Sequence, residues 1–504
     1  MLQPMLAAIH ESMLSTPSAP ALLTTAGVVS FGELGRHVQG VIDALSRLPP
    51  GNILVTGHKE PEVVAAMLAC AFTGRTFVFA DRANPPSRIA RIAAVAGAVH
   101  GLGAGDRVQC EIPGLPVLDL TRLTERALQE ECPRAVADEA VFYIIFTSGS
   151  TGEPKGVPIT RRNFAVFHGW YGPMLADACP AGAHVNHASL AFDMGMLDLW
   201  PTLALGRAVV LLDHRNNVMP RNNIRQLLSA GDVVPGSWFS TPTLLQLMCT
   251  ERDFREECLP GLRCFFVGGE MVRRALVCTL MKRFPQARIL HAYGPSEVTC
   301  MTHVYRLVPE DAEGDGPLPL GRVIAPSGMR ILDGNGREVA VGEWGEVELS
   351  GPQVVHHYLP RDHPGNAAFG RHLGQPTYRT GDIGKLDAQG GLVLSGRADR
   401  QVKWNGNRIE LDEIELAARA LPAVEGAVCL PQYDAAGRVT GIVLFVRPCP
   451  RLPPSRIDIL EGLSRALPGT MTPRDIRFID HLPVTVNGKL DTRALLDEPG
   501  AVPG

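Results

Sequence analysis

The chain has 504 residues, of which 45% are hydrophobic, and its formal net charge at pH 7 is −4. This length exceeds what a single hydrophobic core usually supports, so we expect two or more domains. The small net charge and the absence of basic runs argue against a nucleic-acid partner.

The 11 cysteines are scattered and form no C-x-x-C pair, which argues against structural zinc sites and disulfide frameworks. No uninterrupted apolar segment approaches the length that spans a membrane, and the first residues lack the basic stretch and cleavage site of a secretory signal. We therefore predict a cytoplasmic protein without membrane insertion.

The region 1–140 alternates short apolar strands with helical patterns, as βαβ units do. Ser30 marks the start of the first clear helix, because a hydroxyl residue followed by Glu33 makes a capping box ahead of apolar residues at helical spacing. The other elements expected here are a strand at 52–56, a helix at 62–71, a strand at 76–81 and a helix that begins at 84.

An apolar run, 141–146, predicts a buried strand that leads into the glycine- and hydroxyl-rich segment 147–156. Glycines let backbone N–H groups turn toward an anion, hydroxyls add donors, and Lys155 adds a positive charge. The segment therefore predicts a polyphosphate-binding loop. It is not a Walker loop, since that pattern would need a glycine at Pro154 and a hydroxyl residue at Gly156.

Further short strands separated by helices are expected at 209–213, 236–240, 264–267 and 288–291. From about residue 318 strands and turns dominate, which predicts a mostly β subdomain with strands at 328–332 and 345–349, a turn at 333–336 and a strand-and-turn pattern at 385–392. After residue 399 a small α+β unit is expected, with helices near 411–420 and 455–466 and strands near 425–430 and 440–446.

The fold class that follows is α/β and β. We expect a large N-terminal domain of two α/β subdomains plus a β-rich subdomain, followed by a small mobile α+β C-terminal domain.

Four more motifs follow the phosphate loop in the chain, at 292–297 (Ala-Tyr-Gly-Pro-Ser-Glu), 378–382 (Tyr-Arg-Thr-Gly-Asp), 396–399 (Gly-Arg-Ala-Asp) and 487–489 (Asn-Gly-Lys). With these five motifs in order, the chain resembles, nearly end to end, the adenylate-forming superfamily of acyl- and aminoacyl-activating ligases. Within it the chain is most similar to free-standing amino-acid adenylation enzymes, especially D-alanine–carrier-protein ligases, and to nonribosomal peptide synthetase adenylation domains.

The resemblance implies a domain order of an adenylation core at 1–396 that holds ATP and the amino acid, a hinge at 397–400 and a small lid domain at 401–504. Lys489 of the lid would be the catalytic lysine that bridges the substrate carboxylate and the α-phosphate. Because Lys489 must leave before a thiol can reach the adenylate, the lid must swing about the hinge residue Asp399. Gly406 would then lie beside the pantetheine arm.

The motif residues suit the reaction, because two anions approach each other when a carboxylate attacks the α-phosphate of ATP. Glu297 is suited to hold Mg2+, which prefers a few carboxylates plus phosphate oxygens. Tyr293 offers a flat face for adenine, and Ser296 offers a donor for the α-phosphate. Asp382 can accept both ribose hydroxyls, with Arg397 nearby. Glu297 and Ser296 join the lysine as expected catalytic residues.

The cofactors implied are ATP and Mg2+. One departure from the family is His291, which stands where an asparagine often lies beside the adenine. The residues expected to bind ATP are Thr147, Ser148, Gly149, Ser150, Thr151, Gly152, Lys155, His291, Ala292, Tyr293, Asp382 and Arg397.

Asp193 matches the family position where an aspartate pairs with the ammonium group of an amino acid. A carboxylate in an otherwise apolar pocket is costly unless a cation meets it, so its presence favours an amino-acid substrate. The alternative is that Asp193 caps the helix expected at 194–203. The rest of the pocket, aligned on the motifs, is Met194, Leu197, Phe239, Phe266, Gly268, Ala292, Cys300 and Met301.

No second charge lines this pocket and four of its walls are bulky, so we expect a small apolar amino acid: D-alanine, glycine or L-alanine. Gly268 replaces a cysteine found in many D-alanine ligases and opens some space, which keeps L-proline as an alternative. One methylene is worth only about 1–3 kcal/mol of discrimination, so the pocket alone does not decide between them.

The leading hypothesis is therefore an amino acid–carrier-protein ligase whose acceptor is a separate phosphopantetheinylated carrier protein, because no carrier pattern follows the last motif. A carboxylic acid–CoA ligase, in which Asp193 would be structural, is the second hypothesis. A non-catalytic nucleotide-binding relative is the third, and the presence of Lys155, Glu297, Asp382 and Lys489 argues against it.

Overall fold

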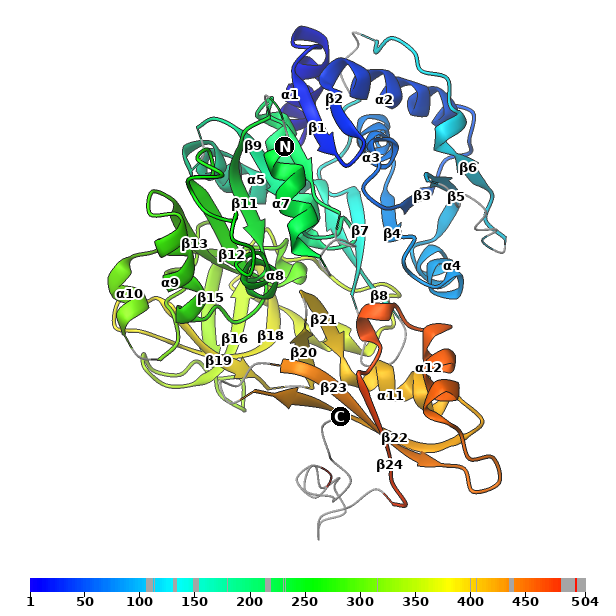
Figure 1. Cartoon of the computed structure of the whole chain (residues 1–504), viewed down its shortest axis with the longest axis vertical. Coiled ribbons are helices and arrows are strands. Elements are labelled where there is room, and N and C mark those ends of the chain that lie inside the picture. The colour runs from blue at the N-terminus through cyan, green and yellow to red at the C-terminus, as the bar shows by residue number, and fades with distance from the viewer. Residues whose placement is uncertain are drawn as a thin grey trace. The chain divides into compact units, whose positions relative to one another are not determined.

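Figure 1 shows the computed structural model of the chain, which divides into two compact units. The first unit contains Met1–Asp81, Ala93–Phe146 and Gly156–Ala398, and the second contains Arg82–Ile92, Thr147–Lys155 and Asp399–Gly504. The structure describes residues 1–105, 112, 114–129, 134–147, 154–178, 180–213, 219–229, 231, 233–314, 316–398, 400–404, 406–434, 439–481 and 495. The division into core, hinge and lid expected from the sequence stays a prediction.

A six-stranded sheet has the strand order β6-β5-β3-β4-β7-β8. Its pairs β3–β4, β3–β5, β4–β7 and β5–β6 are parallel, and parallel neighbours require crossover connections such as helices α3 (Pro61–Thr73) and α4 (Pro86–Val95). The strands are β3 (Asn52–Gly57), β4 (Phe77–Asp81), β5 (Ala98–Gly103), β6 (Val117–Asp119), β7 (Val141–Thr147) and β8 (Lys155–Thr160). The predicted strands at 52–56, 76–81 and 141–146 are therefore confirmed.

Helix α2 (Phe31–Leu45) begins where the sequence predicts. The Ser30 hydroxyl accepts a hydrogen bond from the Glu33 backbone N–H, and the Glu33 carboxylate accepts one from the Ser30 backbone N–H at 2.8 Å. That second bond is the main reason why the pKa of Glu33 is lowered. The predicted capping box is confirmed.

An eight-stranded sheet has the order β14-β13-β12-β11-β9-β10-β1-β2. Its strands from β13 to β1 pair in parallel, and β14 and β2 add antiparallel edges. The strands are β1 (Pro20–Thr24), β2 (Gly27–Ser30), β9 (Ala183–Asn186), β10 (Val209–Leu211), β11 (Pro235–Ser240), β12 (Cys264–Gly268), β13 (Arg288–Tyr293) and β14 (His303–Leu307). The four strands predicted between 209 and 291 are confirmed with small shifts at their ends.

The following helices also lie within the first unit, and those between β9 and β13 in the chain connect parallel strands of this sheet. They are α1 (Gln3–Ser15), α5 (Arg161–Ala178), α6 (Asp193–Ala204), α7 (Pro220–Leu228), α8 (Pro242–Met248), α9 (Arg274–Arg283) and α10 (Pro309–Glu313). Trp200 of α6 is fully buried, and its ring lies 4.9 Å from that of Phe142 in β7 and 6.1 Å from that of Phe77 in β4. Helix α6, whose first residue is Asp193, therefore packs against the six-stranded sheet while it connects strands of the eight-stranded one.

The β-rich part of the first unit is an antiparallel sheet in the order β15-β16-β18-β17, with β19 paired to β18. Its strands are β15 (Gly328–Leu332), β16 (Gly345–Ser350), β17 (Phe369–His372), β18 (Gln375–Leu386) and β19 (Leu392–Arg397). The predicted turn is confirmed, because the Asp333 carboxylate accepts from the backbone N–H groups of Asn335 and Arg337 at 2.8 and 2.9 Å.

The C-terminal part of the second unit has the α+β composition that the sequence predicts. A hairpin of β20 (Gln401–Trp404) and β21 (Asn407–Glu410), not predicted as strands, precedes helix α11 (Leu411–Arg419). A three-stranded sheet and a second helix follow, formed by β22 (Val424–Tyr433), β23 (Val439–Pro448), α12 (Arg456–Ser464) and β24 (Asp475–Phe478). The predicted helices and strands are confirmed, and both strands are longer than expected.

Among the described residues, no helix has both the length and the apolar character that crossing a bilayer requires. The cytoplasmic location stays a prediction.

The capping box supplies a stability test. Replacing Ser30 by alanine removes the side-chain acceptor for the Glu33 N–H, so we expect the free energy of unfolding to fall by about 1 kcal/mol. Urea denaturation followed by circular dichroism measures this change. Ser15→Ala is the control, because the Ser15 hydroxyl only donates to the Glu11 carbonyl within α1. An equal loss in both variants would contradict the assignment.

Candidate active site

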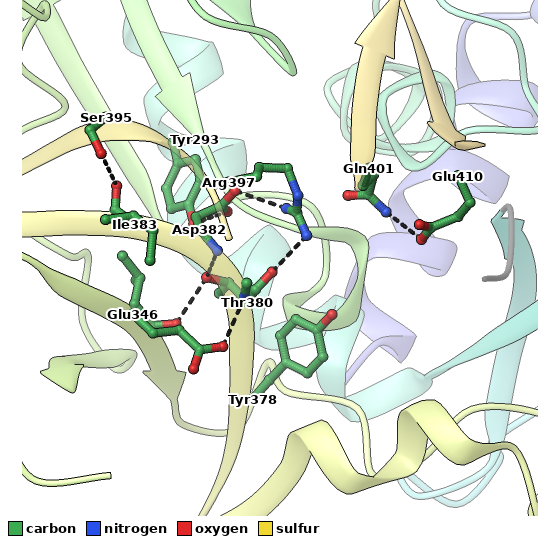
Figure 2. A network of polar contacts seen from close by, with 12 residues as sticks. Tyr293, Glu346, Tyr378, Thr380, Asp382, Ile383, Ser395, Arg397, Gln401 and Glu410 are labelled. Carbon is green, nitrogen blue, oxygen red and sulfur yellow. Dashed lines mark hydrogen bonds and ion pairs between the residues drawn. The ribbon is translucent and has the colours of Figure 1, made fainter. Parts of the chain in front are cut away.

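Asp382 lies at the centre of a polar network in the first unit, shown in Figure 2. The Tyr293 hydroxyl donates to Asp382 Oδ2 at 2.6 Å, and Arg397 Nη1 donates to Asp382 Oδ1 at 2.8 Å. Arg397 Nη2 also donates to the Thr380 carbonyl at 3.1 Å. Asp382 and Arg397 face each other in the register of β18 and β19, whereas Tyr293 ends β13 in a different sheet. Three residues expected at ATP are thus brought together.

The chemistry of this network suits a ribose. Asp382 is buried, and each of its carboxylate oxygens already accepts a hydrogen bond, as two ribose hydroxyls would require. Burial, and secondly the charge of Asp382, hold the pKa of Tyr293 well above its ordinary value, so its phenol stays a donor. Arg397 balances the charge of the carboxylate.

His291, which is expected from the sequence beside the adenine, is buried as a neutral imidazole. Its Nδ1 lies 2.8 Å from the Pro319 carbonyl oxygen, and because a carbonyl only accepts, Nδ1 carries the proton. Burial lowers the pKa of His291 to about 4. Nε2 therefore keeps a lone pair at neutral pH and can accept a hydrogen bond from an exocyclic amine, as the oxygen of an asparagine side chain would.

Glu297 is fully buried in the short 3-10 turn Ser296–Val298. The Tyr358 hydroxyl donates to Glu297 Oε1 at 2.6 Å and lies 2.9 Å from the Tyr378 hydroxyl. Sequence reasoning missed Tyr358, and it gave no role to Tyr378 although this residue opens a recognised motif. No local pattern announces either contact, because these tyrosines come from parts of the chain remote from Glu297 in sequence.

The donor set fits a magnesium ion that arrives with a nucleotide. Mg2+ commonly takes one or two protein carboxylates and completes its shell with phosphate oxygens and water. Among the described residues no group of three or more His, Cys, Asp or Glu could hold a metal ion on its own, and Glu297 supplies one carboxylate. Thr147, at the start of the predicted phosphate loop, has a buried hydroxyl without a hydrogen-bond partner among the described residues.

Asp193 and Ser296 form a second pair of contacting polar residues in the first unit. Asp193 is half-buried at the first position of α6, and its Oδ2 accepts a hydrogen bond from the Ser296 hydroxyl at 2.6 Å. Its Oδ1 accepts from the Met194 backbone N–H at 2.8 Å. The residue at the N-cap position is Phe192, so Asp193 does not cap the helix in the ordinary way. The serine expected at the α-phosphate here contacts the carboxylate expected at the ammonium group.

The backbone beside Ser296 is strained. Thr299 and Cys300 have φ angles of 51° and 73°, and two consecutive non-glycine residues in this region are uncommon. Cys300 is buried next to Asp193, and burial together with this carboxylate raises the pKa of its thiol well above the ordinary value. The same two causes raise the pKa of the buried Tyr143 hydroxyl. Both groups therefore stay protonated near the carboxylate.

The predicted pocket residues gather in one part of the first unit. The register of β11, β12 and β13 sets Phe239 opposite Phe266 and Gly268 opposite Ala292. The two phenylalanine rings lie 5.9 Å apart. The pocket residues other than the glycine belong to one buried hydrophobic cluster, namely Met194, Leu197, Phe239, Phe266, Ala292, Cys300 and Met301.

Gly268 does not leave the space that its small size suggests. A Cβ built on it would lie 2.4 Å from the carbonyl oxygen of Ala292 and 3.1 Å from the Ala292 Cβ. The glycine therefore permits a close approach of β12 and β13, and backbone atoms fill the space where a side chain would begin. The expected extra room at this position, which was the reason for keeping L-proline, is reduced.

Several predicted site residues lie outside the described part of the chain: Ser148, Gly149, Ser150, Thr151, Gly152, Asp399 and Lys489. Lys155 is described, and its Nζ lies 3.7 Å from Glu410 Oε1 within the second unit. Gln401 donates to the same oxygen at 2.6 Å, as Figure 2 shows. Gly406 has a φ of 77°, which favours a glycine between β20 and β21.

Comparison with known proteins now identifies the family. A model described as "AMP-binding enzyme" matches residues 9–359. The chain belongs to the family of AMP-binding enzymes. It is an ATP-dependent ligase that forms AMP.

Among its relatives are proteins named D-alanine–D-alanyl carrier protein ligase. The one from Lactiplantibacillus plantarum is 31% identical over 91% of either chain, and the one from Streptococcus pyogenes serotype M49 is 30% identical over 99% of either chain. These relatives match almost the whole length of the AMP-binding enzyme described here.

Solved structures of adenylation domains share the fold. A holo nonribosomal peptide synthetase protein with adenylation and PCP domains, bound to a vinylsulfonamide inhibitor, superposes with a TM-score of 0.79 and 25% identity, covering 97% of this chain and 84% of its own. The Vibrio cholerae adenylation domain AlmE, in complex with glycyl-adenosine-5'-phosphate, has a TM-score of 0.82 and 22% identity, covering 97% and 96% of the two chains. The fold class predicted from the sequence is confirmed.

The buried state of His291 predicts a pH dependence. Its pKa is about 4 in the folded protein and about 6.5 in an unfolded chain, so the unfolded state takes up the proton first as the pH falls. His291 thus lowers the free energy of unfolding below about pH 6.5, by about 2 kcal/mol at pH 5. His291→Asn keeps a possible acceptor for adenine and removes this loss. Urea denaturation of both proteins at pH 7.5 and at pH 5 measures the difference, and parallel pH curves would contradict it.

Proposed function

We propose that this enzyme activates a small apolar amino acid with ATP as an aminoacyl-adenylate and transfers it to the phosphopantetheine thiol of a separate carrier protein. The observation that carries the proposal is Asp193, a half-buried carboxylate at the edge of an apolar cluster. Apart from Asp193, the predicted pocket set contains no charged side chain. Such a carboxylate is best compensated by a cation, and the ammonium group of an amino acid supplies one.

The amino acid is most simply D-alanine, with glycine and L-alanine as close competitors. The names of the relatives support D-alanine. The packing of the pocket supports a small side chain, because Phe239 and Phe266 are buried in contact and Ala292 backbone atoms fill the space at Gly268. L-proline remains a second candidate that the test below includes.

In the first half-reaction the ammonium group binds Asp193, and the substrate carboxylate attacks the α-phosphate of ATP while pyrophosphate leaves. Asp382 accepts the ribose hydroxyls between Tyr293 and Arg397, and His291 accepts the adenine amine. Holding both reactants in this way converts a bimolecular encounter into an effectively unimolecular step. Mg2+, when bound through Glu297, supplies positive charge to the phosphate oxygens.

Two residues and one loop complete the proposed first half-reaction. Ser296 and Lys489 donate to the oxygens that carry charge as the α-phosphate is attacked, and the loop 147–156 holds the β- and γ-phosphates. In the second half-reaction the lid at 401–504 turns about Asp399, and Gly406 approaches the pantetheine arm. The family description and the names of the relatives support the ATP and carrier assignments, and the family motifs support the Mg2+ assignment.

Pyrophosphate exchange driven by single acids tests the proposal. We expect exchange with D-alanine, glycine or L-alanine and little with propionate, because propionate has the carboxylate and methyl group of alanine but no ammonium group for Asp193. Asp193→Ala should lower kcat/KM for the amino acid about a hundredfold or more, as expected for loss of one partner of an ion pair. The KM for ATP should change little.

The exposed Asp253 gives a matched control, because Asp253→Ala removes a carboxylate from a surface turn. This variant should behave like the wild type. Exchange that is faster with propionate or longer carboxylic acids than with any amino acid would refute the proposal and favour a carboxylic acid–CoA ligase. Exchange driven best by L-proline would revise the amino acid only.

The assignment of Lys489 predicts a separate defect. Lys489→Ala removes the positive charge that would offset charge development at the α-phosphate, so adenylation should fall by at least about a thousandfold. ATP binding, followed by titration calorimetry, should be retained because the ribose and adenine contacts are intact. Arg465→Ala, an exposed cation in the second unit, is the control. Unchanged pyrophosphate exchange in Lys489→Ala would contradict the role.

A further inference from the structure

A cluster of buried charged and polar side chains lies beneath helix α6, and the proposed reaction uses none of them directly. It connects the segment after β3 with β4, β9, β10 and α6, all within the first unit. Its members are His58, Lys59, Asp81, His184, Asn186, Asp198 and Asp213. Buried charges cost stability unless partners compensate them, so we ask which function such a cluster serves.

Lys59 is the cation at the centre of this cluster. Its Nζ donates to the side-chain oxygen of Asn186 at 2.7 Å and to the Asn186 carbonyl at 3.0 Å. Burial lowers the pKa of Lys59 to about 7, while Asp198, Asp213 and Asp81 act in the opposite direction. Burial therefore disfavours the charged form of this amine, but the amine donates hydrogen bonds to Asn186 in either protonation state.

Asn186 connects Lys59 with helix α6 through two hydrogen bonds of its side chain. Because its side-chain oxygen accepts from Lys59, its amide nitrogen must face the other way, and this nitrogen donates to the Gly195 carbonyl at 2.9 Å. Gly195 lies in the first turn of α6, two residues after Asp193. The same nitrogen also lies 3.5 Å from Asp198 Oδ2. A methionine at position 59 would remove the donor that fixes the Asn186 side-chain oxygen and would thereby weaken the hold of the amide on the Gly195 carbonyl.

The first turn of α6 is also tightly packed. A Cβ on Gly195 would lie 2.4 Å from the Ser189 carbonyl oxygen, so the turn rests directly on backbone. The Ser189 hydroxyl lies 3.5 Å from Asp81 Oδ2, and His58 contacts Asp81 and Asp213 at 3.0 and 2.9 Å. The residues after β3 thus hold both the turn that precedes α6 and the first turn of the helix.

We propose that Lys59 is a positioning residue for amino-acid recognition: through Asn186 it orients the first turn of α6 and thereby the carboxylate of Asp193. This inference rests on the proposed role of Asp193 as the acceptor for the substrate ammonium group. Lys59 itself does not touch the substrate. Small errors in the position of a recognition group reduce catalysis strongly. The contacts from Lys59 through Asn186 to α6 therefore affect catalysis although they lie behind the pocket.

The test compares an amino acid with its counterpart that lacks the amine. Only the amino acid uses Asp193, so the ratio of kcat/KM for D-alanine to that for propionate reports on the position of this carboxylate. Lys59→Met should lower the ratio about tenfold or more, mainly through the KM for D-alanine, and should leave the KM for ATP nearly unchanged. Whichever amino acid the wild type prefers replaces D-alanine in this ratio.

Two further variants keep the test decisive. Lys59→Met/Asn186→Leu replaces the polar pair by apolar side chains, which avoids an unpaired Asn186 oxygen and supports folding, and it should show the same loss. Arg161→Met removes another buried cation, which donates to the Ala71 carbonyl, and should keep the wild-type ratio even if it lowers stability.

The outcomes separate this inference from the proposed function. A wild-type enzyme that does not prefer the amino acid over propionate would overturn the role of Asp193 and with it this inference. A wild-type preference that persists in Lys59→Met and in the double variant would overturn the role of Lys59 alone. Equal losses for both acids in Lys59→Met would show a general structural effect and would also overturn it.

Discussion

In the proposed function, substrate recognition depends on the half-buried carboxylate of Asp193. A carboxylate beside apolar side chains is costly, and the Ser296 hydroxyl and the Met194 N–H are two donors that compensate it. Neither donor carries a charge. Under the proposed function, the ammonium group of the substrate would add a positive charge beside this carboxylate, which is a physical basis for selecting amino acids.

The two α/β sheets place the site at the carboxyl ends of their strands, where doubly wound folds usually bind ligands. Tyr293 ends β13, Gly268 ends β12, and Asn186 ends β9. Asp382 comes instead from the antiparallel sheet, and the Tyr293–Asp382 hydrogen bond joins that sheet to the end of β13. One tyrosine thus links the apolar pocket with the polar network expected at the ribose.

Sequence reasoning was strongest where function depends on a short motif. The strand and loop around 141–156, the capping box at Ser30 and the motif residues Tyr293, Asp382 and Arg397 could be named because local patterns carry them. Contacts between distant segments could not be named in this way. Tyr358 on Glu297, and Lys59 behind Asn186, depend on packing between elements far apart in the chain, and neither residue belongs to a pattern of its own.

Gly268 shows that the size of a residue alone does not predict the volume of a pocket. From the sequence, a glycine in place of a cysteine implies a larger pocket, but in the folded chain the glycine allows β13 to come so close that the Ala292 carbonyl fills the space. Volume in a pocket is set by backbone spacing as much as by side chains. A substrate larger than alanine would therefore have to find room against Phe239, Phe266 or Met301, which are buried in the same hydrophobic cluster. Under the proposed function, this packing, rather than any single side chain, would limit the size of the amino acid.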